Sequence, residues 1–369
     1  MSSLTPQPSG SNHPQPRLVI STHDTHIWKL AYLPDGRRVV AGSDKGTVTV
    51  WNLESGEQEG TSMKHKRKIS GFAVALDGTN IVGGDNDGNI TVWNAKSHKI
   101  VKQWTHPDGR PEIAISPDGR LIAVGDETVV FYTMEGSQVN HSIEVGVSLF
   151  SMSFSPDGKK LACGIQDGRI WVYNVDSGTL VLGPLWGHRD CVRCVLWSRD
   201  GSRLFSGSED ETIRYWNSDT EEQIGRSWTG HGNHIRSLSL SPDGSILASA
   251  SLDHTVRFWD VTTGNPIGQH LQHDTRVDDV RFSPSGEFVV SVEGDGNICL
   301  WRVPWLNSIK HQVITSLRCP SVLTYSSLPL SNRQALLIST RRARACTAHD
   351  CPSPIHLSPR TSAWMLILV

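Results

Sequence analysis

An aromatic residue recurs along most of this chain at a nearly constant interval, and this interval constrains the fold more than any other feature. The successive steps are 42, 39, 41, 43, 43 and 42 residues, between Trp51, Trp93, Tyr132, Tyr173, Trp216, Trp259 and Trp301. Short apolar runs of strand length, separated by turn residues, fill each interval. A repeat of about 40–45 residues with four strands is typical of a propeller blade. We therefore expect an all-β propeller of seven four-stranded antiparallel blades.

The fifth repeat shows a polar pattern that the other repeats follow more loosely. His188 is followed 18, 22 and 28 residues later by Ser206, Asp210 and Trp216. This spacing resembles the WD40 repeat, and by residue match the resemblance implies a buried structural tetrad of these four side chains. A buried carboxylate is costly unless it is hydrogen-bonded, and the imidazole, hydroxyl and indole groups can form a connected chain to it. The fourth strand of this repeat is expected at residues 223–228.

The same resemblance implies complete tetrads in the sixth and seventh repeats. Their members are His231, Ser249, Asp253 and Trp259, and His273, Ser291, Asp295 and Trp301. The first four repeats depart from the pattern; the third has Tyr132 for the Trp, and the fourth has Cys163 for the Ser. Because each hydrogen bond in a polar network is worth on the order of 1 kcal/mol, we expect the N-terminal half of the propeller to be less stable.

The two ends of the repeat array predict how the ring closes. Residues 17–22 form a short strand with no hairpin partner before it, and Pro304 follows the seventh repeat where a turn and a fourth strand would begin. In the family that the repeats resemble, such an N-terminal strand completes the last blade, which removes an exposed edge. The predicted organisation is a disordered leader at 1–16, the propeller at 17–303 and a disordered or atypical basic tail at 304–369.

Composition limits the class of partner and the compartment. The net charge is −2, but residues 304–369 hold seven basic residues and one acidic residue, so residues 1–303 carry about −8. A nucleic-acid partner is not expected, because phosphate contacts need a basic surface. Four of the seven cysteines fall in or beside expected strands, which favours a reducing compartment. With neither a signal peptide nor a membrane-length apolar run, we expect a cytoplasmic protein, with a nuclear location left open.

Two groups of potential metal ligands do not fit a known site. Cys191 and Cys194 have C-x-x-C spacing, but they lie on an expected strand without a second pair. Four tail residues have a loosely zinc-like spacing that matches no finger, namely Cys346, His349, Cys351 and His356. We therefore expect no metal and no cofactor.

Catalysis is also not expected. The His, Ser and Asp sets recur in blade after blade, as a structural device does and a single active site does not. We find neither a phosphate-binding glycine loop nor a pair of carboxylates marked by anything except the repeat. An enzyme that uses the central channel remains the alternative from another functional class.

The resemblance implies a non-catalytic scaffold or adaptor that binds segments of other proteins. Family members usually bind through the face that carries the loops before each first strand, here called the top face. Carried over by offset, the top-face residues are His26, Trp28, Asp44, Lys68, Phe150, Gln166, Arg193, Glu209, His234, Arg236, Arg276 and Asp278. A ubiquitin-ligase substrate receptor is the second interpretation; such receptors tend to carry W-D-x-R, whereas this chain has Trp259-Asp260-Val261-Thr262.

The top-face residues also suggest the chemistry of the partner. Arg193, Arg236 and Arg276 fall on consecutive repeats, and a closed ring brings Trp28 next to them, with Lys68 expected elsewhere on the rim. An Arg fork favours a carboxylate or phosphate, and an aromatic ring favours an apolar anchor. We expect a monomeric propeller within a complex, with a partner segment that is acidic or phosphorylated and carries one large apolar residue.

Overall fold

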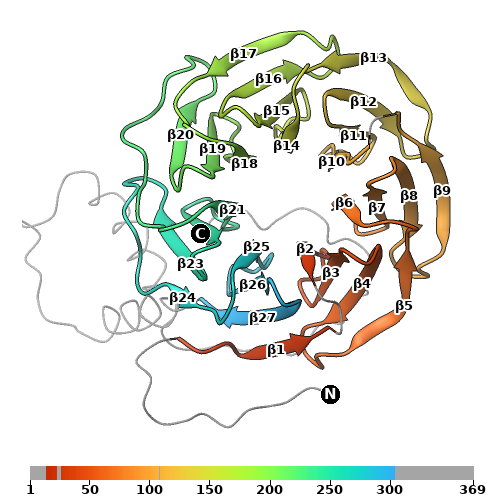
Figure 1. Ribbon diagram of the computed structural model, residues 1–369, viewed down its shortest axis with the longest axis horizontal. Helices are drawn as coiled ribbons and strands as arrows, with labels where there is room; N and C mark the ends of the chain where they lie inside the picture. The colour runs from red at the N-terminus through yellow and green to blue at the C-terminus, as the bar shows by residue number, and fades with distance from the viewer. Residues whose placement is uncertain (1–13, 23–25, 108, 304–369) are drawn as a thin grey trace, which may run out of the picture. The chain divides into compact units, whose positions relative to one another are not determined.

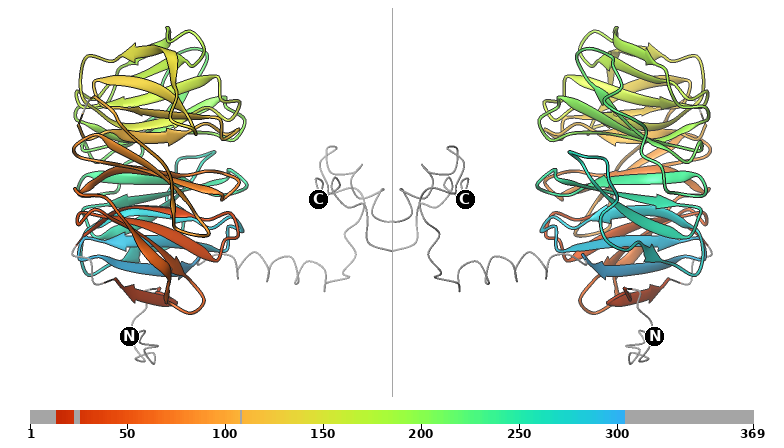
Figure 2. Two further views of the ribbon diagram at one scale, coloured as in Figure 1. Left: turned by 90° about the vertical axis from the view of Figure 1, so that its right-hand side faces the viewer. Right: turned by 90° about the vertical axis from the view of Figure 1, so that its left-hand side faces the viewer.

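The fold is a ring of seven β-sheets. The structure is a computed structural model and describes residues 14–22, 26–107 and 109–303. Its described residues form 27 strands in seven antiparallel sheets that surround a central opening (Figure 1). Figure 2 shows the ring from the side, where the strands run from one face of the ring toward the other. Within these ranges we find no helix with the length and apolarity that a membrane crossing requires. The predicted all-β seven-bladed propeller is confirmed.

The first four blades have four strands each, numbered from the channel outward. Blade 1 contains β2 (Ile27–Tyr32), β3 (Arg38–Ser43), β4 (Thr47–Asn52) and β5 (Gln58–Lys64). Blade 2 contains β6 (Ile69–Val74), β7 (Asn80–Asp85), β8 (Asn89–Asn94) and β9 (Ile100–Thr105). Blade 3 contains β10 (Glu112–Ile115), β11 (Leu121–Gly125), β12 (Thr128–Thr133) and β13 (Gln138–Glu144). Blade 4 contains β14 (Leu149–Phe154), β15 (Lys160–Ile165), β16 (Ile170–Asn174) and β17 (Leu180–Leu185).

The last three blades vary at their outer edges. Blade 5 contains β18 (Val192–Trp197), β19 (Arg203–Ser208) and β20 (Ile213–Asn217). Blade 6 contains β21 (Ile235–Leu240), β22 (Ile246–Ser251), β23 (Thr255–Asp260) and the short β24 (Leu271–Gln272). Blade 7 contains β25 (Val277–Phe282), β26 (Phe288–Glu293) and β27 (Asn297–Arg302), and its outer strand is β1 (Leu18–Ser21).

The outer edge of blade 5 differs from the prediction. Residues 223–228 were expected to form a regular strand, but within residues 109–303 they form two isolated bridges, Trp216 with Gln223 and Ile213 with Trp228. Gly225 lies between the bridges with a φ of 69°. This left-handed conformation, which glycine adopts readily, interrupts the extended backbone that a continuous ladder with β20 would need.

Strand β1 closes the ring. It pairs antiparallel with β27, with Leu18 opposite Leu300 and Ser21 opposite Asn297. The Arg17 amide extends this ladder by donating to the Leu300 carbonyl at 2.7 Å. Ile20 is 4% exposed and packs in an apolar cluster with residues of blades 7 and 1. The predicted closure by the N-terminal strand is confirmed.

Apolar cores fill the space between neighbouring blades. On β26, Val289 packs toward blade 6 and the next residue, Val290, packs toward blade 1, and both are fully buried. Successive side chains on a strand point to opposite faces. A middle strand that is covered on both faces therefore needs an uninterrupted apolar run, which is what the repeats contain.

A buried carboxylate joins three blades where the ring closes. Asp279 on β25 is 1% exposed. Its Oδ2 accepts a hydrogen bond from the Leu30 amide of blade 1 at 2.6 Å, and its Oδ1 accepts one from the Ser237 hydroxyl of blade 6. Arg281 of blade 7 donates to the same carboxylate at 3.2 Å. Asp279 therefore ties blades 6, 7 and 1 together.

Candidate functional site

A cavity of about 810 Å³ lies at the centre of the ring, between the inner strands of the blades. Its lining contains six basic and four acidic side chains: Lys29, Lys68, Arg110, Arg193, Arg236 and Arg281, and Glu112, Asp126, Asp278 and Asp279. The cavity is therefore basic on balance, although residues 1–303 together carry about −8. A surplus of positive charge in a cavity with low-dielectric walls raises the local concentration of anionic ligands.

Three cations of this lining lie over two aromatic rings. The Lys68 ammonium lies 3.5 Å from the centroid of the Trp28 ring, and the Arg236 guanidinium carbon lies 5.8 Å from the same ring. The Arg193 guanidinium carbon lies 4.1 Å from the centroid of the Phe150 ring. Because a ring face attracts a cation, these contacts hold three positive charges in defined places around the channel. We call these five residues the cation–aromatic cluster.

The position of Lys68 corrects the sequence analysis, which placed it away from Trp28. Lys68 precedes β6 of blade 2, and Trp28 is on β2 of blade 1. These blades are neighbours, and the apolar stem of a lysine is long enough to bring its ammonium over an adjacent ring. The Trp28 ring is thus covered by cations from two blades.

Burial, with a smaller contribution from neighbouring cations, disfavours the positive charges of the cluster. Burial lowers the pKa of Lys68; Asp44 opposes this shift, while Arg110 and Arg236 add to it. Burial also lowers the pKa of Arg236, and the nearby Arg193 adds to that effect. Both shifts show that the surroundings disfavour the positive forms, so a bound anion would relieve the repulsion.

Two carboxylates offset part of this positive charge. Glu209 Oε1 accepts from Arg193 Nε at 2.6 Å, and His234 Nδ1 lies 3.6 Å from the same oxygen. Asp278 Oδ1 lies 3.7 Å from Arg236 Nε. The hydrogen bond to Glu209 orients the Arg193 guanidinium, and both carboxylates keep the field of the cluster local.

Some of the predicted top-face residues contact members of the cation–aromatic cluster and their partners. His26 Nε2 lies 2.9 Å from Asp278 Oδ2 and 3.1 Å from Arg276 Nη2, and the His26 ring packs 3.8 Å from the Trp28 ring. His26 and Asp278 are buried, and their contacts orient Trp28 and the cations; Asp278 also contributes to the cavity lining. Of the predicted set, the lining contains Trp28, Lys68, Phe150, Arg193, Arg236 and Asp278. Asp44 is half-buried and Gln166 is exposed.

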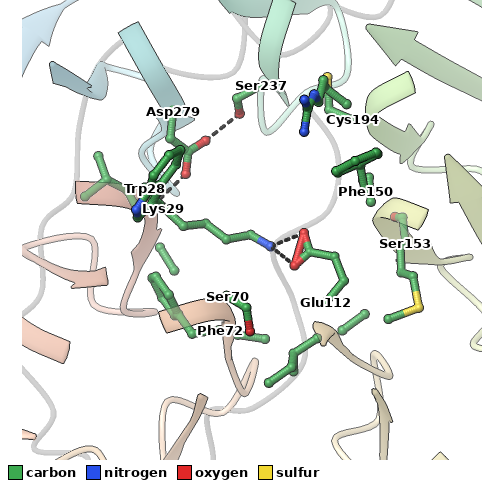
Figure 3. Close-up of a pocket in the computed structure, with 18 of the residues that line it drawn as sticks. Trp28, Lys29, Ser70, Phe72, Glu112, Phe150, Ser153, Cys194, Ser237 and Asp279 are labelled. Atoms are coloured by element: carbon green, nitrogen blue, oxygen red, sulfur yellow. Dashed lines mark hydrogen bonds and ion pairs between the residues drawn. The ribbon is translucent and has the colours of Figure 1, made fainter. Parts of the chain in front are cut away.

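Sequence reasoning missed an ion pair that crosses the channel. Lys29 Nζ on β2 lies 2.8 and 3.0 Å from the two carboxylate oxygens of Glu112 on β10, which joins blades 1 and 3 across the opening (Figure 3). Gly71 of blade 2 leaves room for it, because a Cβ there would lie 2.7 Å from Glu112 Oε2. The two charged residues are 83 positions apart, and no local pattern links them.

The tetrads of blades 5 and 6 have nearly identical geometry. His188 Nδ1 lies 2.9 Å from Asp210 Oδ2, and its Nε2 lies 2.8 Å from Ser206 Oγ, which also accepts from Trp216 Nε1 at 2.9 Å. The corresponding distances in blade 6 are 2.8, 2.6 and 2.8 Å, among His231, Asp253, Ser249 and Trp259. In each tetrad the imidazole is buried. Such enclosed and repeated groups have the geometry of structural links between strands and loops.

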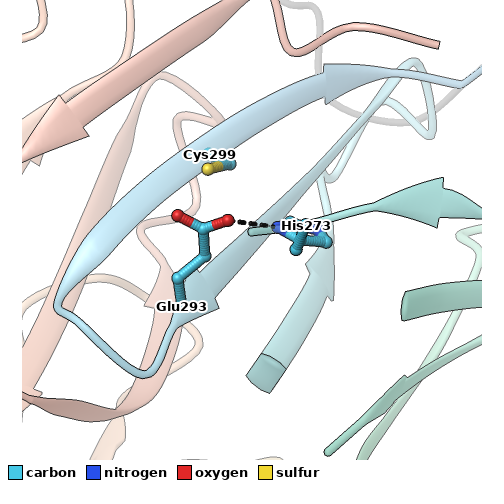
Figure 4. A group of neighbouring side chains, drawn as sticks. All are labelled: His273, Glu293 and Cys299. Carbon is cyan, nitrogen blue, oxygen red and sulfur yellow. Dashed lines mark hydrogen bonds and ion pairs between the residues drawn. The ribbon is translucent and has the colours of Figure 1, made fainter. Parts of the chain in front are cut away.

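The tetrad of blade 7 is different from the predicted one. Asp295 is exposed and accepts from Asn297, whereas His273 Nδ1 lies 3.1 Å from Glu293 Oε1 (Figure 4). Ser291 Oγ lies 3.3 Å from His273 Nε2 and accepts from Trp301 Nε1 at 3.0 Å. The assignment of Asp295 was wrong because Glu293, two residues earlier, takes over the carboxylate role with its longer side chain.

The buried histidines predict how stability depends on pH. Burial lowers the pKa of His188 and His231, although Asp210 and Asp253 favour the charged imidazoles. When the pKa of a histidine is lower in the folded state, the unfolded state binds the proton more readily. The folded state is therefore favoured above the unfolded pKa of about 6.5, and the free energy of unfolding decreases as the pH falls below it. We therefore expect the free energy of unfolding, measured with urea, to decrease from pH 7.5 to pH 5.5. An equal or higher value at pH 5.5 would contradict this expectation.

Comparison with known proteins identifies the repeats. The family model described as "WD domain, G-beta repeat" matches five segments that make up about half of the chain, at residues 14–52, 138–174, 180–217, 222–260 and 264–302. The chain is also 25% identical over 174 residues to "Protein groucho" of Drosophila melanogaster, which covers 46% of this chain and 24% of the fly protein. The alignment thus spans about a quarter of that relative.

Proposed function

Because this chain belongs to the WD40-repeat family, whose propellers generally mediate protein–protein interactions, we propose that it is a non-catalytic adaptor that binds a partner segment at its central channel. The observation that carries this proposal is the cation–aromatic cluster, in which Lys68, Arg236 and Arg193 are held over two aromatic rings. Trp and Arg are the residues that most often dominate the binding energy of protein interfaces.

The chemistry of the cluster favours an anionic segment with an apolar anchor. The cavity has a basic surplus within an acidic propeller, and its cations repel one another. A carboxylate or phosphate would accept hydrogen bonds from the guanidinium groups, and an apolar side chain would pack on Trp28 or Phe150. Since Glu209 and Asp278 offset part of the charge, salt should weaken binding only moderately.

Peptide binding tests this proposal. Synthetic peptides that combine phosphoserine or consecutive Glu residues with one Trp or Leu would be titrated against the full chain by fluorescence polarisation. We expect Arg193→Glu, Arg236→Glu and Trp28→Ala each to weaken the best peptide by roughly 10-fold or more. Arg226→Glu is the matched control, because Arg226 is exposed beyond β20 and does not line the cavity. If the three variants bind like the parent, the channel is not the site.

The other interpretations have less support. A ubiquitin-ligase receptor would be expected to carry Arg two residues after the Asp of W-D-x-R, whereas this chain has Thr262 there and Asp260 accepts a hydrogen bond from the Thr263 amide at 2.7 Å. An enzyme would need reactive groups that a substrate can reach, and the His, Ser and Asp sets of blades 5 and 6 are enclosed within the blades. We therefore propose neither activity.

A further inference from the structure

The polar cluster of blade 7 differs from its counterparts in blades 5 and 6 at two positions. One position lies two residues before the turn Asp, and the other lies two residues before the Trp. Glu293 and Cys299 occupy these positions in blade 7, where the other two blades have Ser208 and Ser251, and Arg214 and Arg257. Both substitutions in blade 7 introduce a side chain that can bind a metal ion.

These substitutions bring three potential ligands together around His273. A nitrogen of His273, a carboxylate oxygen of Glu293 and the sulfur of Cys299 all lie within 4.8 Å of one another. The three residues are 4, 6 and 2% exposed, which distinguishes the group from a chance cluster of surface acids. Figure 4 shows the Glu293 carboxylate pointing at the imidazole, with the Cys299 sulfur close by.

Surrounding groups orient two of the ligands. Ser291 Oγ lies 3.3 Å from the other imidazole nitrogen of His273. The Asp274 amide donates to Glu293 Oε1 at 3.2 Å, and Asn297 Nδ2 donates to Glu293 Oε2 at 3.3 Å. Partners of this kind commonly fix the orientation of metal ligands.

The charge balance of blade 7 also differs from that of its counterparts. In blade 5 the Arg214 guanidinium is close enough to interact with the buried Asp210 carboxylate. In blade 7 a neutral thiol replaces that cation. Blade 7 therefore has a local excess of negative charge where blades 5 and 6 carry an arginine.

We propose that His273 Nδ1, the Glu293 carboxylate and Cys299 Sγ form a binding site for one divalent cation of the zinc type. Nitrogen, oxygen and thiolate ligands together suit Zn²⁺, which binds all three. Binding replaces the Cys299 thiol proton, which leaves to solvent. The His273 imidazole binds as the tautomer that carries its single proton on Nε2, which donates to Ser291 Oγ, and the Nδ1 lone pair binds the cation. This proposal revises the sequence-based expectation of no metal. The sequence did not indicate the site, because the ligands at 273, 293 and 299 follow no known spacing.

Metal binding would stabilise the blade that closes the ring. His273 precedes β25, Glu293 ends β26, and Cys299 lies on β27 opposite Val19 of β1. A cation bound by all three residues would link these segments beside the closing strand. Because the ligand set is assembled only in the folded protein, metal binding favours the folded state.

Zinc binding to the full chain tests the proposal. The parent and every variant in this test carry Cys346→Ser and Cys351→Ser. These two substitutions remove the cysteines of the tail group, which could bind zinc independently. After treatment with a chelator, the protein is titrated with Zn²⁺ by calorimetry and its thermal unfolding is followed. We expect one site per chain and a rise in melting temperature. Cys299→Ser should weaken binding by more than the roughly 10- to 100-fold that loss of an outer-shell partner causes. Cys163→Ser, a buried cysteine of blade 4, is the matched control and should bind like the parent.

Cobalt provides a second readout that does not depend on the folding of the Cys299 variant. Co²⁺ bound to a thiolate gives a near-ultraviolet charge-transfer band, which we expect in the chain without Cys346 and Cys351. Absence of this band, or absence of Zn²⁺ binding at about 100 µM, would overturn the proposal. Equal Zn²⁺ affinity of a folded Cys299→Ser variant would overturn it as well.

Discussion

Deletion of residues 1–22 is expected to destabilise the propeller, with a melting temperature roughly 10 °C below that of the parent. The deletion removes β1 and with it the buried Ile20 side chain, worth about 1.5–3 kcal/mol. It also removes the ladder to β27, in which each hydrogen bond contributes about 1 kcal/mol. A loss of about 3–5 kcal/mol lowers the melting temperature by roughly 2–4 °C per kcal/mol in a domain of this size. Calorimetry or circular dichroism would measure it.

Point variants separate loss of the strand from loss of chain length. Ile20→Asp should reproduce most of the effect, because it places a carboxylate in the core between blades 7 and 1. Ser21→Asp is the matched control, since the Ser21 side chain is exposed on the same strand. Deletion of residues 310–369, which lie outside the described residues, should leave the melting temperature unchanged. Equal melting temperatures for the parent and the 1–22 deletion would refute the role of β1.

Asp279→Ala is expected to cost about 3–5 kcal/mol of unfolding free energy, the range observed when one partner of a buried ion pair is removed. The substitution leaves the Arg281 guanidinium without its carboxylate, and it leaves the Leu30 amide and the Ser237 hydroxyl without their acceptor. Because these groups belong to three blades, the substitution weakens the contacts among blades 6, 7 and 1 and not only one sheet.

Urea unfolding of matched variants would test this expectation. Asp279→Asn should cost less than Asp279→Ala, because an amide oxygen can still accept a hydrogen bond. Asp243→Ala is the control. Asp243 is an exposed turn residue that accepts hydrogen bonds from its neighbours Ser241 and Ser245, and we expect a cost below about 1 kcal/mol. A cost for Asp279→Ala no larger than that of Asp243→Ala would contradict the proposed role.

The number of blades could be predicted because its signal is local, and the mode of closure could be predicted because the family that the repeats resemble closes its ring with an N-terminal strand. The aromatic spacing depends on strand and turn lengths within one repeat, and Pro304 marks the point where the last repeat stops. The outer edge of blade 5 could not be predicted in the same way. Residues 223–228 have the composition of a strand, and the positive φ of Gly225 is a property of the folded backbone.

The contacts of the candidate site depend on where the ring places distant residues. The offsets of the family that the repeats resemble predicted that Arg193, Arg236 and Arg276 would line one arc with Trp28 next to it. Trp28, Arg193 and Arg236 line the cavity, whereas Arg276 does not. The Lys29–Glu112 pair crosses between blades that are not neighbours, which no offset describes. The choice of Glu293 over Asp295 depends on side-chain reach, because two carboxylates near the same turn compete for one imidazole.

Closure by β1 also has a consequence for how the protein is made. Leu18 is synthesised about 280 residues before its partner Leu300. At about 5–20 residues per second, translation leaves β1 without its partner strand for roughly 15–60 s. During this delay the apolar residues Val19 and Ile20 are available for incorrect strand pairing, in the nascent chain or with other chains. The strand that completes the ring is thus the segment that needs protection for longest during synthesis.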